Sequence, residues 1–265
     1  MVLGGGRAHL QGRRDARDLL QEWVADKQGQ GVLVTSGTEL AMVNASDTEY
    51  LFGVFAEEEM SYRLDLEETV DEPTLAEMTA KALELLGKSE EGFVLFVESA
   101  LVDKAHHEGW ARRSLEEVLQ LEAAVEVALN MTSSEETLTV VTADHSHSFT
   151  LSGYANRGTD ILGFDPLEPS YLSLMYGTGP GGARPEGWSP PGEPRLAAGD
   201  FRYPAAAYRD SAAHQGEEVA LYATGPGAHL FRGLLQQHYI PHTLAYAACI
   251  CLPHYPTCPT YCNQP

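Results

Sequence analysis

The chain has few basic residues for its length. Its 265 residues include 17 Lys and Arg against 38 Asp and Glu, which gives a formal charge of −21. This balance argues against a nucleic-acid or anionic-membrane partner, because phosphate groups are bound by an excess of Lys and Arg. If the substrate is an anion, bound cations must reverse the potential locally.

Long apolar runs are also absent. No stretch approaches the roughly 18 apolar residues that a membrane-spanning helix needs. Residues 1–7 lack the basic region and apolar core of a secretory signal. The apolar content of 43% still allows a substantial core. We therefore expect a folded chain of about one large domain, without a transmembrane helix.

Cysteine is confined to the last 17 residues. The four are Cys249, Cys251, Cys258 and Cys262. Their spacing fits a structural zinc site poorly, which favours a disulfide over a metal knot. A disulfide implies an oxidising compartment, and the N-glycosylation sequons at Asn44 and Asn130 give this weak support.

Apolar periodicity predicts alternating helices and strands. Helices are expected over 15–27, 73–86, 114–129 and 228–237, and strands over 32–34, 51–55, 92–97, 138–143 and 219–222. Ser114-x-x-Glu117 is read as a capping box that opens the third helix, with Leu115, Val118, Val125 and Leu129 facing inward. The alternation predicts an α/β fold with a largely parallel, doubly wound sheet and helices on both faces.

The composition changes in the middle of the chain. Glycine and proline are frequent from about residue 153 to 213, around one strand-like run at 171–176. We interpret this as a loop-rich surface insertion. The expected domains are an α/β metal-site core over 1–152, the insertion over 153–213, and a return to the core over 214–265.

Two clusters of acid and imidazole side chains each follow a predicted strand. Asp144-His145-Ser146-His147 comes after the run 138–143, and Glu98, Asp103, His106, His107 and Glu108 come after the run 92–97. Catalytic groups of open α/β sheets lie at such strand ends. Carboxylate and imidazole ligands together suit zinc, and an oxygen-only position suits magnesium. The pattern predicts one polymetal site.

The spacing within each cluster leaves an alternative open. Asp103 and His107 would face a single ion if a helical turn begins there, but His106-His107-Glu108 could simply start a solvated helix. Asp144 and His145 could reach one ion only after a sharp turn beyond Ala143, and Asp144 could instead be a helix N-cap. The occurrence of both clusters in one chain weakens these alternatives.

The motifs together resemble a known family. Phe96-Val97-Glu98 with Asp103-x-x-His106-His107-Glu108, Thr142 to His147, and His214-x-Gly216-Glu217-Glu218 resemble the C-terminal half of the animal alkaline phosphatases, as do Leu3 to Arg7 and Ala247-Ala248-Cys249. The resemblance implies the alkaline phosphatase fold and hydrolysis of phosphate monoesters by a homodimer. It also implies two zinc ions, one magnesium ion and a phosphoserine intermediate.

The resemblance assigns ligands residue by residue. It implies Asp103, His107 and His214 for the first zinc, Asp144 and His145 for the second, and Glu98 for magnesium. His106 and His147 are expected to orient ligands or phosphate-bound water. A calcium site would use Phe55 and Asp71, with Glu57 or Glu58 in place of the glutamate that the family has at Ala56.

Other family features follow from the same resemblance. It implies a disulfide between Cys249 or Cys251 and Cys258, and a crown-like subdomain over 153–213. It also implies an extracellular or cell-surface location. Family members carry a lipid anchor, although neither an anchor signal nor a signal peptide is found in this sequence.

The family's nucleophilic serine and phosphate-clamping arginine precede its Gly-Gly-Gly-Arg segment, so we expect residues 1–265 alone to be inactive. The sequence also departs from the family where Ser99-Ala100-Leu101 replaces Gly-Gly-Arg and Lys104 replaces His. Two alternatives are a non-catalytic metal-binding or dimer-interaction module and another metallohydrolase of the superfamily, such as a sulfatase or phosphodiesterase. The latter would share the Asp-His turn but not the spacing of Glu98, Asp103 and His107.

Overall fold

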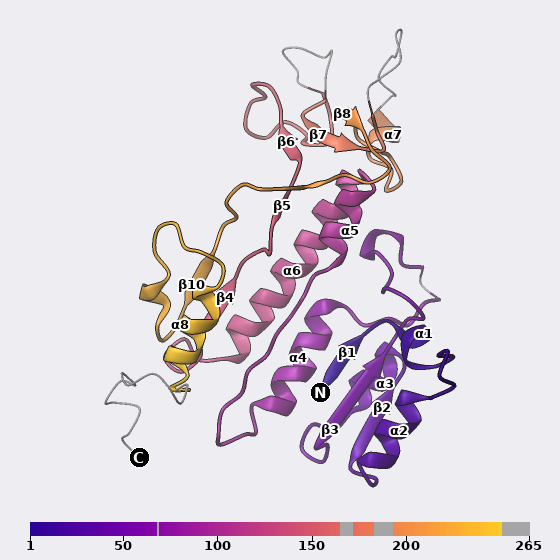
Figure 1. Cartoon of the computed structure of the whole chain (residues 1–265), viewed down its shortest axis with the longest axis vertical. Helices are drawn as coiled ribbons and strands as arrows, with labels where there is room; N and C mark the ends of the chain where they lie inside the picture. Colours follow the sequence, from indigo (N-terminus) through magenta and orange to yellow (C-terminus); the bar gives the residue numbers. More distant parts are fainter. Residues whose placement is uncertain (68, 165–171, 183–192, 251–265) are drawn as a thin grey trace. The chain divides into compact units, whose positions relative to one another are not determined.

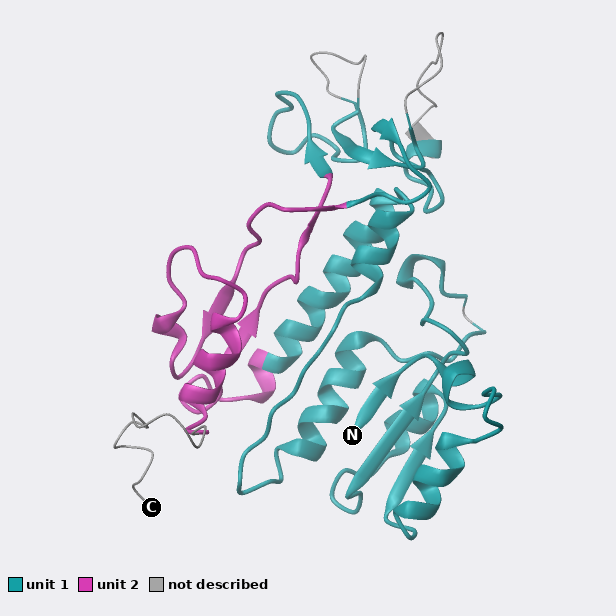
Figure 2. Cartoon of the chain, viewed as in Figure 1, with its two compact units in different colours: residues 1–128, 149–213 teal, residues 129–148, 214–265 magenta. Residues whose placement is uncertain are grey.

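The computed structural model describes residues 1–67, 69–164, 172–182 and 193–250. The chain divides into two compact units, shown in teal and magenta in Figure 2. Unit 1 comprises residues 1–128 and 149–213, and unit 2 comprises residues 129–148 and 214–265. The domain boundaries expected from composition stay a prediction, and each unit is described by itself.

Unit 1 begins with a parallel three-stranded sheet (Figure 1). Its strands are β1 (Val2–Gly4), β2 (Gly31–Val34) and β3 (Tyr50–Val54), in the order β1-β3-β2. The register pairs Val2 with Phe52 and Gly31 with Tyr50. The strands predicted at 32–34 and 51–55 are confirmed to within one residue.

Helices cover both faces of this sheet. They are α2 (Leu19–Asp26), α3 (Gly37–Met42) and α4 (Leu75–Leu86), with the short α1 (Arg7–Leu10) after β1. Leu51 is fully buried in a cluster with Leu40 of α3 and Leu85 of α4. The next residue, Phe52, meets Trp23 of α2 with ring centroids 5.4 Å apart. Because successive strand residues point to opposite faces, these contacts confirm the predicted layers.

Local signals set where these helices begin. The Asp18 carboxylate accepts the N–H groups of Leu20 and Gln21 and so caps α2. Thr74 and Glu77 form a reciprocal capping box at the start of α4. Such caps satisfy N–H groups that have no partner within the helix. The predicted helix at 73–86 is confirmed, and the one at 15–27 is shorter because Asp18 starts it later.

The strand predicted over 92–97 is wrong. Among the described residues, 93–98 pair with no strand, and Figure 1 draws the segment between α4 and α5 as a plain tube. Phe93, Leu95 and Val97 are half-buried, whereas Val94 and Phe96 are 80% and 85% exposed. A strand requires a neighbour for its backbone hydrogen bonds, which apolar sequence alone does not supply.

The helical pair α5 (Leu101–His107) and α6 (Ala111–Met131) follows this segment. The prediction that α6 opens at Ser114 is wrong, because the helix begins at Ala111. The Ser114 hydroxyl donates to the Val102 carbonyl, and the Glu117 carboxylate accepts the N–H of Arg63 in the 3₁₀ turn η1 (Arg63–Asp65). Both side chains are buried. They make tertiary contacts in place of a cap.

The apolar face expected for this helix is only partly correct. Leu115 packs against a buried cluster and Val125 is half-buried. Val118 and Leu129 are exposed, contrary to the prediction. Two of the four residues expected to face inward are therefore exposed.

A second sheet completes unit 1. It contains β6 (Phe149–Leu151), β7 (Leu174–Gly179) and β8 (Ala205–Tyr208), in that order, with the short α7 (Glu193–Leu196) nearby in sequence. Leu174, Tyr176 and Tyr203 are fully buried in its core. The predicted strand at 171–176 is shifted, since β7 begins at Leu174. A Cβ on Gly181 would lie 1.9 Å from the Tyr203 carbonyl oxygen, so this approach requires glycine.

Unit 2 is built from two antiparallel strand pairs and a helix. The pairs are β10 (Tyr222–Thr224) with β4 (Thr139–Val141), and β5 (Ser146–His147) with β9 (His214–Gln215); η2 (Ala228–Leu230) and α8 (Tyr239–Ala247) follow. The strand predicted at 138–143 is present but shorter. The strand expected at 219–222 begins only at Tyr222, and the helix expected at 228–237 is a single 3₁₀ turn. The expected parallel pairing does not hold in this unit.

The predicted disulfide involves residues outside the described part of the chain. These are Cys251, Cys258 and Cys262, so the disulfide stays a prediction.

Across the part of the chain that the structure describes, no helix has both the length and the apolar character that crossing a membrane requires.

Candidate metal centre

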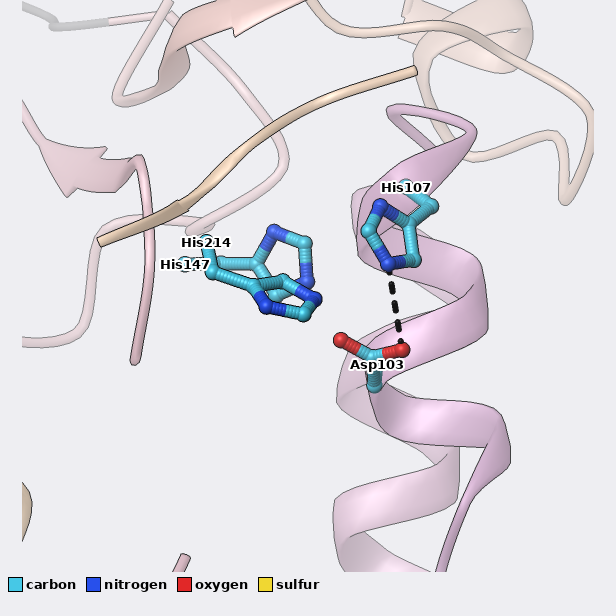
Figure 3. A group of neighbouring side chains, drawn as sticks. All are labelled: Asp103, His107, His147 and His214. Carbon is cyan, nitrogen blue, oxygen red and sulfur yellow. Dashed lines mark ion pairs between the residues drawn. The ribbon is translucent and has the colours of Figure 1, made fainter. Parts of the chain in front are cut away.

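Helix α5 carries Asp103 and His107 on one face, four residues apart. The Asp103 carboxylate oxygen and the His107 Nε2 are 3.3 Å apart (Figure 3). Both side chains are about one-third exposed, so they remain accessible to an ion from solvent. The helical turn on which the predicted ligand pair depended is therefore present.

The opposite nitrogen of His107 is held by backbone. Its Nδ1–H donates to the Ala212 carbonyl over 2.7 Å, and the Ser211 hydroxyl lies 2.9 Å from the same nitrogen. A carbonyl partner at one ring nitrogen fixes the tautomer and directs the lone pair of the other nitrogen outward. Sequence reasoning missed Ser211 and Ala212, and their only signal was their position just before His214.

His106 is embedded in a chain of hydrogen bonds. Its Nδ1 is 2.8 Å from the Tyr176 hydroxyl, and its Nε2 is 2.8 Å from the Ser114 hydroxyl. Since Ser114 donates to Val102, it accepts from His106, which in turn accepts from Tyr176. Burial raises the pKa of Tyr176 and keeps this phenol a donor. This bonding is compatible with the predicted orienting role.

Lys104 points its charge at another element of unit 1. Its ammonium group pairs with the Glu59 carboxylate. The hydrogen bond from Lys104 lowers the pKa of Glu59 and keeps that side chain anionic. The cation at the position where the family has His is therefore matched by an anion beside it.

Glu98, the predicted magnesium ligand, ends the extended segment in unit 1. Its side chain is exposed, and it lies shortly before α5 in sequence, which begins at Leu101. Its assignment to magnesium stays a prediction.

Unit 2 gathers three imidazoles. His147 and His214 face each other across β5 and β9, and each offers a nitrogen within 4.8 Å of the other (Figure 3). The His145 ring stacks on His214 with centroids 3.5 Å apart. His147 is buried, at 7% exposure. Antiparallel pairing of two short strands thus brings together residues about seventy positions apart.

Asp144 joins this group through its neighbour. The chain bends at Asp144, as the prediction required, and the Asp144 carboxylate lies 3.3 Å from His145 Nε2. The other nitrogen of His145 is 3.0 Å from the Ser146 carbonyl oxygen. Asp144 is not a helix N-cap, because the next element is the strand β5.

The residues proposed for calcium have structural contacts in unit 1. Asp71 accepts the N–H of Thr38 at the start of α3, and its hydrogen bonds to Thr38 lower its pKa. Phe55 is buried and donates its N–H to Gly4, while Glu57 pairs with Arg7. The calcium site stays a prediction.

The glycosylation candidates are both exposed. Asn44 donates its side-chain amide to Asp47, and Asn130 lies near the end of α6. Their accessibility is compatible with modification, which stays a prediction.

Comparisons with known proteins agree on one family. The family model described as alkaline phosphatase matches residues 1–250. The tissue-nonspecific alkaline phosphatase of Gallus gallus is 39% identical over 94% of this chain and 53% of its own. A membrane-bound alkaline phosphatase of Bombyx mori is 35% identical over 94% of this chain and 49% of its own. The chain thus spans about half the length of the curated relatives it matches.

Solved structures show the same fold. The alkaline phosphatase of the Antarctic bacterium TAB5 aligns with a TM-score of 0.64 at 19% identity, over 94% of this chain and 60% of its own. The Thermus thermophilus enzyme aligns with a TM-score of 0.53 at 30% identity, over 58% of this chain and 33% of its own. A variant of the TAB5 enzyme has magnesium bound in its M3 site.

Proposed function

This chain belongs to the alkaline phosphatase family, and from that premise we propose that it supplies metal ligands for the hydrolysis of phosphate monoesters. The proposal places Asp103, His107 and His214 on one zinc ion. It places Asp144 and His145 on a second zinc ion and Glu98 on magnesium. The family match favours this function over the sulfatase or phosphodiesterase alternative.

The separation of the ligand atoms supports the proposal most directly. In both Asp103–His107 and Asp144–His145, a carboxylate oxygen and an imidazole nitrogen lie 3.3 Å apart. Two ligands of one tetrahedral zinc ion, each bonded at about 2.0–2.1 Å, are also separated by roughly 3.3 Å. Each pair therefore has the spacing of a zinc-ligand pair within its own unit.

The orientation of His107 supports the same assignment. The His107 Nδ1–H donates to the Ala212 carbonyl, and Nε2 is the ring nitrogen that faces Asp103. When bound, a pair of zinc ions stabilises the attacking and leaving oxygens of an in-line displacement at phosphorus. The contribution of these side chains is to fix the ligand atoms before substrate arrives.

The remaining family properties belong to the same proposal. They are a phosphoserine intermediate, a homodimer, the C-terminal disulfide, glycosylation and an extracellular or cell-surface location; a relative described as membrane-bound gives the location some support. Residues 1–265 alone are expected to be inactive, because the resemblance puts the nucleophilic serine in sequence outside this match.

Zinc titration of purified residues 1–265 tests the ligand assignment. We expect His107→Gln to weaken zinc binding by roughly a hundredfold. The substitution removes one proposed zinc ligand, and Asp103 is then the remaining ligand proposed for that ion within unit 1. The control is His229→Gln, a substitution of an exposed histidine in η2, which should titrate like the unsubstituted chain. Equal zinc affinities for His107→Gln and its control would show that the assignment is wrong.

Hydrolysis of a simple phosphate ester by the same preparations tests the second part. No zinc-dependent turnover is expected from residues 1–265 alone. Turnover that disappears in His107→Gln would contradict the predicted inactivity while leaving the ligand assignment intact.

A further inference from the structure

The carboxylates that the family resemblance offers for calcium have other partners in unit 1. Calcium takes roughly six to eight oxygen ligands, so its site needs several carboxylates or carbonyls that face one point. The family has a glutamate at position 56, but this chain has alanine, whose side chain provides no oxygen. A calcium site would therefore depend on Asp71 and on a carboxylate that shifts in from Glu57 or Glu58.

The Asp71 carboxylate is bonded to the start of α3. The Thr38 N–H lies 3.0 and 3.2 Å from its two oxygens, and the Asp71 carbonyl accepts the Gly37 N–H over 2.8 Å. A Cβ placed on Gly37 would lie only 2.9 Å from Asp71 Oδ1. The carboxylate thus lies against the helix backbone, where it accepts an N–H group that has no partner within α3.

The three glutamates that follow Ala56 each have a basic partner in unit 1. The pairs are Arg7–Glu57, His9–Glu58 and Lys104–Glu59. The first two basic residues belong to α1, and the third belongs to α5. Glu57 and Glu58 therefore face α1, and neither side chain replaces the glutamate that is missing at position 56.

Backbone bonds hold the same segment against the start of α1. The carbonyls of residues 56–58 accept the N–H groups of residues 6–8 over 2.6–3.1 Å. The Arg7 guanidinium also donates to the Val54 carbonyl at the end of β3, over 3.0 Å. Side chains and backbone of α1 and its preceding turn thus fix the segment from β3 to Glu58.

We propose that residues 56–59 are held by Arg7, His9 and Lys104 in place of a calcium ion. The donor set implied for calcium does not fit one ion, because the Asp71 oxygens face α3 and the glutamates face basic side chains. One exposed ion pair contributes little by itself, but three on consecutive residues act together with the backbone bonds. The proposal concerns calcium alone, so it does not depend on the zinc ligands.

Amide exchange with and without calcium tests the proposal on unsubstituted residues 1–265. Zinc is kept saturating, so that calcium does not enter the centre at α5. Peptides that cover residues 54–60 should exchange at the same rate, within about twofold, in the presence and absence of calcium. A calcium site with a Kd of about 1 mM would instead slow their exchange roughly tenfold at about 10 mM calcium.

Substitution of the paired glutamates tests the role of the basic side chains. In Glu57→Gln with Glu59→Gln, the N–H groups of residues 6–8 should exchange at least about fivefold faster, because two ion pairs of the segment are lost. The matched control is Glu22→Gln with Asp26→Asn, which removes the same charge and two exposed ion pairs of α2. The control should leave exchange at residues 6–8 unchanged within about twofold.

Two results would overturn the proposal. One is a calcium-dependent slowing of exchange at residues 54–60 by more than about twofold, which would show that the segment binds the ion. The other is equal exchange at residues 6–8 in the glutamate variant and its control, which would show that the basic side chains do not hold the segment.

Discussion

Glu117 is a carboxylate in a place that disfavours its charge. It is 6% exposed, and its oxygen accepts the Arg63 N–H over 2.7 Å. Burial raises its pKa, and the hydrogen bond from Arg63 offsets part of that rise. The folded state therefore binds a proton at pH values where the unfolded state has released it, so this residue lowers stability as pH rises above about 4.5.

Glu117→Gln should reduce that pH dependence. Glutamine keeps an oxygen for the Arg63 N–H and carries no charge to desolvate. Relative to the unsubstituted chain, the variant should become more stable as pH rises from about 4 through the raised pKa. Urea midpoints over this range measure the difference. Glu122→Gln, on an exposed position of α6, serves as the control, and parallel pH profiles for Glu117→Gln and the unsubstituted chain would contradict the prediction.

Helix α5 is held in place by hydrogen bonds of two adjacent histidines. His106 bonds Tyr176 of β7 and Ser114 of α6, while His107 bonds the Ala212 carbonyl. The helix has only seven residues, too few for stability by hydrogen bonding within itself. The orientation of its Asp103–His107 face therefore depends on these tertiary bonds.

Tyr176→Phe should loosen α5 with little change in packing. The substitution removes the hydroxyl bonded to His106 and keeps a ring in the fully buried site. A loss of about 1–2 kcal/mol in the free energy of unfolding is expected, because a half-buried imidazole nitrogen loses its donor. Urea denaturation measures it against Tyr222→Phe, whose ring is 69% exposed. Equal stability of the two variants would show that the Tyr176 bond contributes nothing.

Elements with local signals could be predicted from sequence. The start of α4 depends on Thr74 and Glu77, and the Asp103–His107 pair depends on the four-residue spacing of one helix. The Ser114-x-x-Glu117 motif misled because it has the same letters as a cap while both side chains bond outside the helix. Residue types alone do not show whether a side chain caps its own helix or bonds to a distant segment.

Contacts between distant segments could not be predicted. Ser211 and Ala212 contact His107 although about a hundred residues of sequence separate them from it. The groups involved are a backbone carbonyl and a serine hydroxyl, and neither gives a sequence signal for this partner. The strand expected at 92–97 failed for a related reason. Its apolar pattern indicates that the side chains favour burial. Strand pairing depends in addition on another segment that lies alongside, which the pattern does not reveal.

At the scale of the whole chain, burial is unequal between the two units. Every buried apolar residue among those described belongs to unit 1, and the buried residues of unit 2 are polar. Burial of apolar surface is the main favourable contribution to folding. Unit 2 therefore has little buried apolar surface of its own to stabilise its short strand pairs.

Hydrogen exchange should separate the units. Amides of β3 in unit 1 are expected to exchange slowly, and those of β4 and β10 in unit 2 to exchange faster, because local opening of the latter exposes little apolar surface. Mass spectrometry of peptides from both regions at one pH measures this. Similar protection in β3 and β4 would mean that unit 2 is as stable as unit 1.

The position of Glu98 at the end of segment 92–98 has a thermodynamic consequence. No strand among the described residues pairs with 93–98, so the backbone that carries Glu98 lacks the restraint of a sheet. A cation held by Glu98 would have to meet the entropic cost of restricting that backbone. Any change that orders the segment should therefore raise cation affinity, and by reciprocity the cation should favour the ordered segment by the same factor.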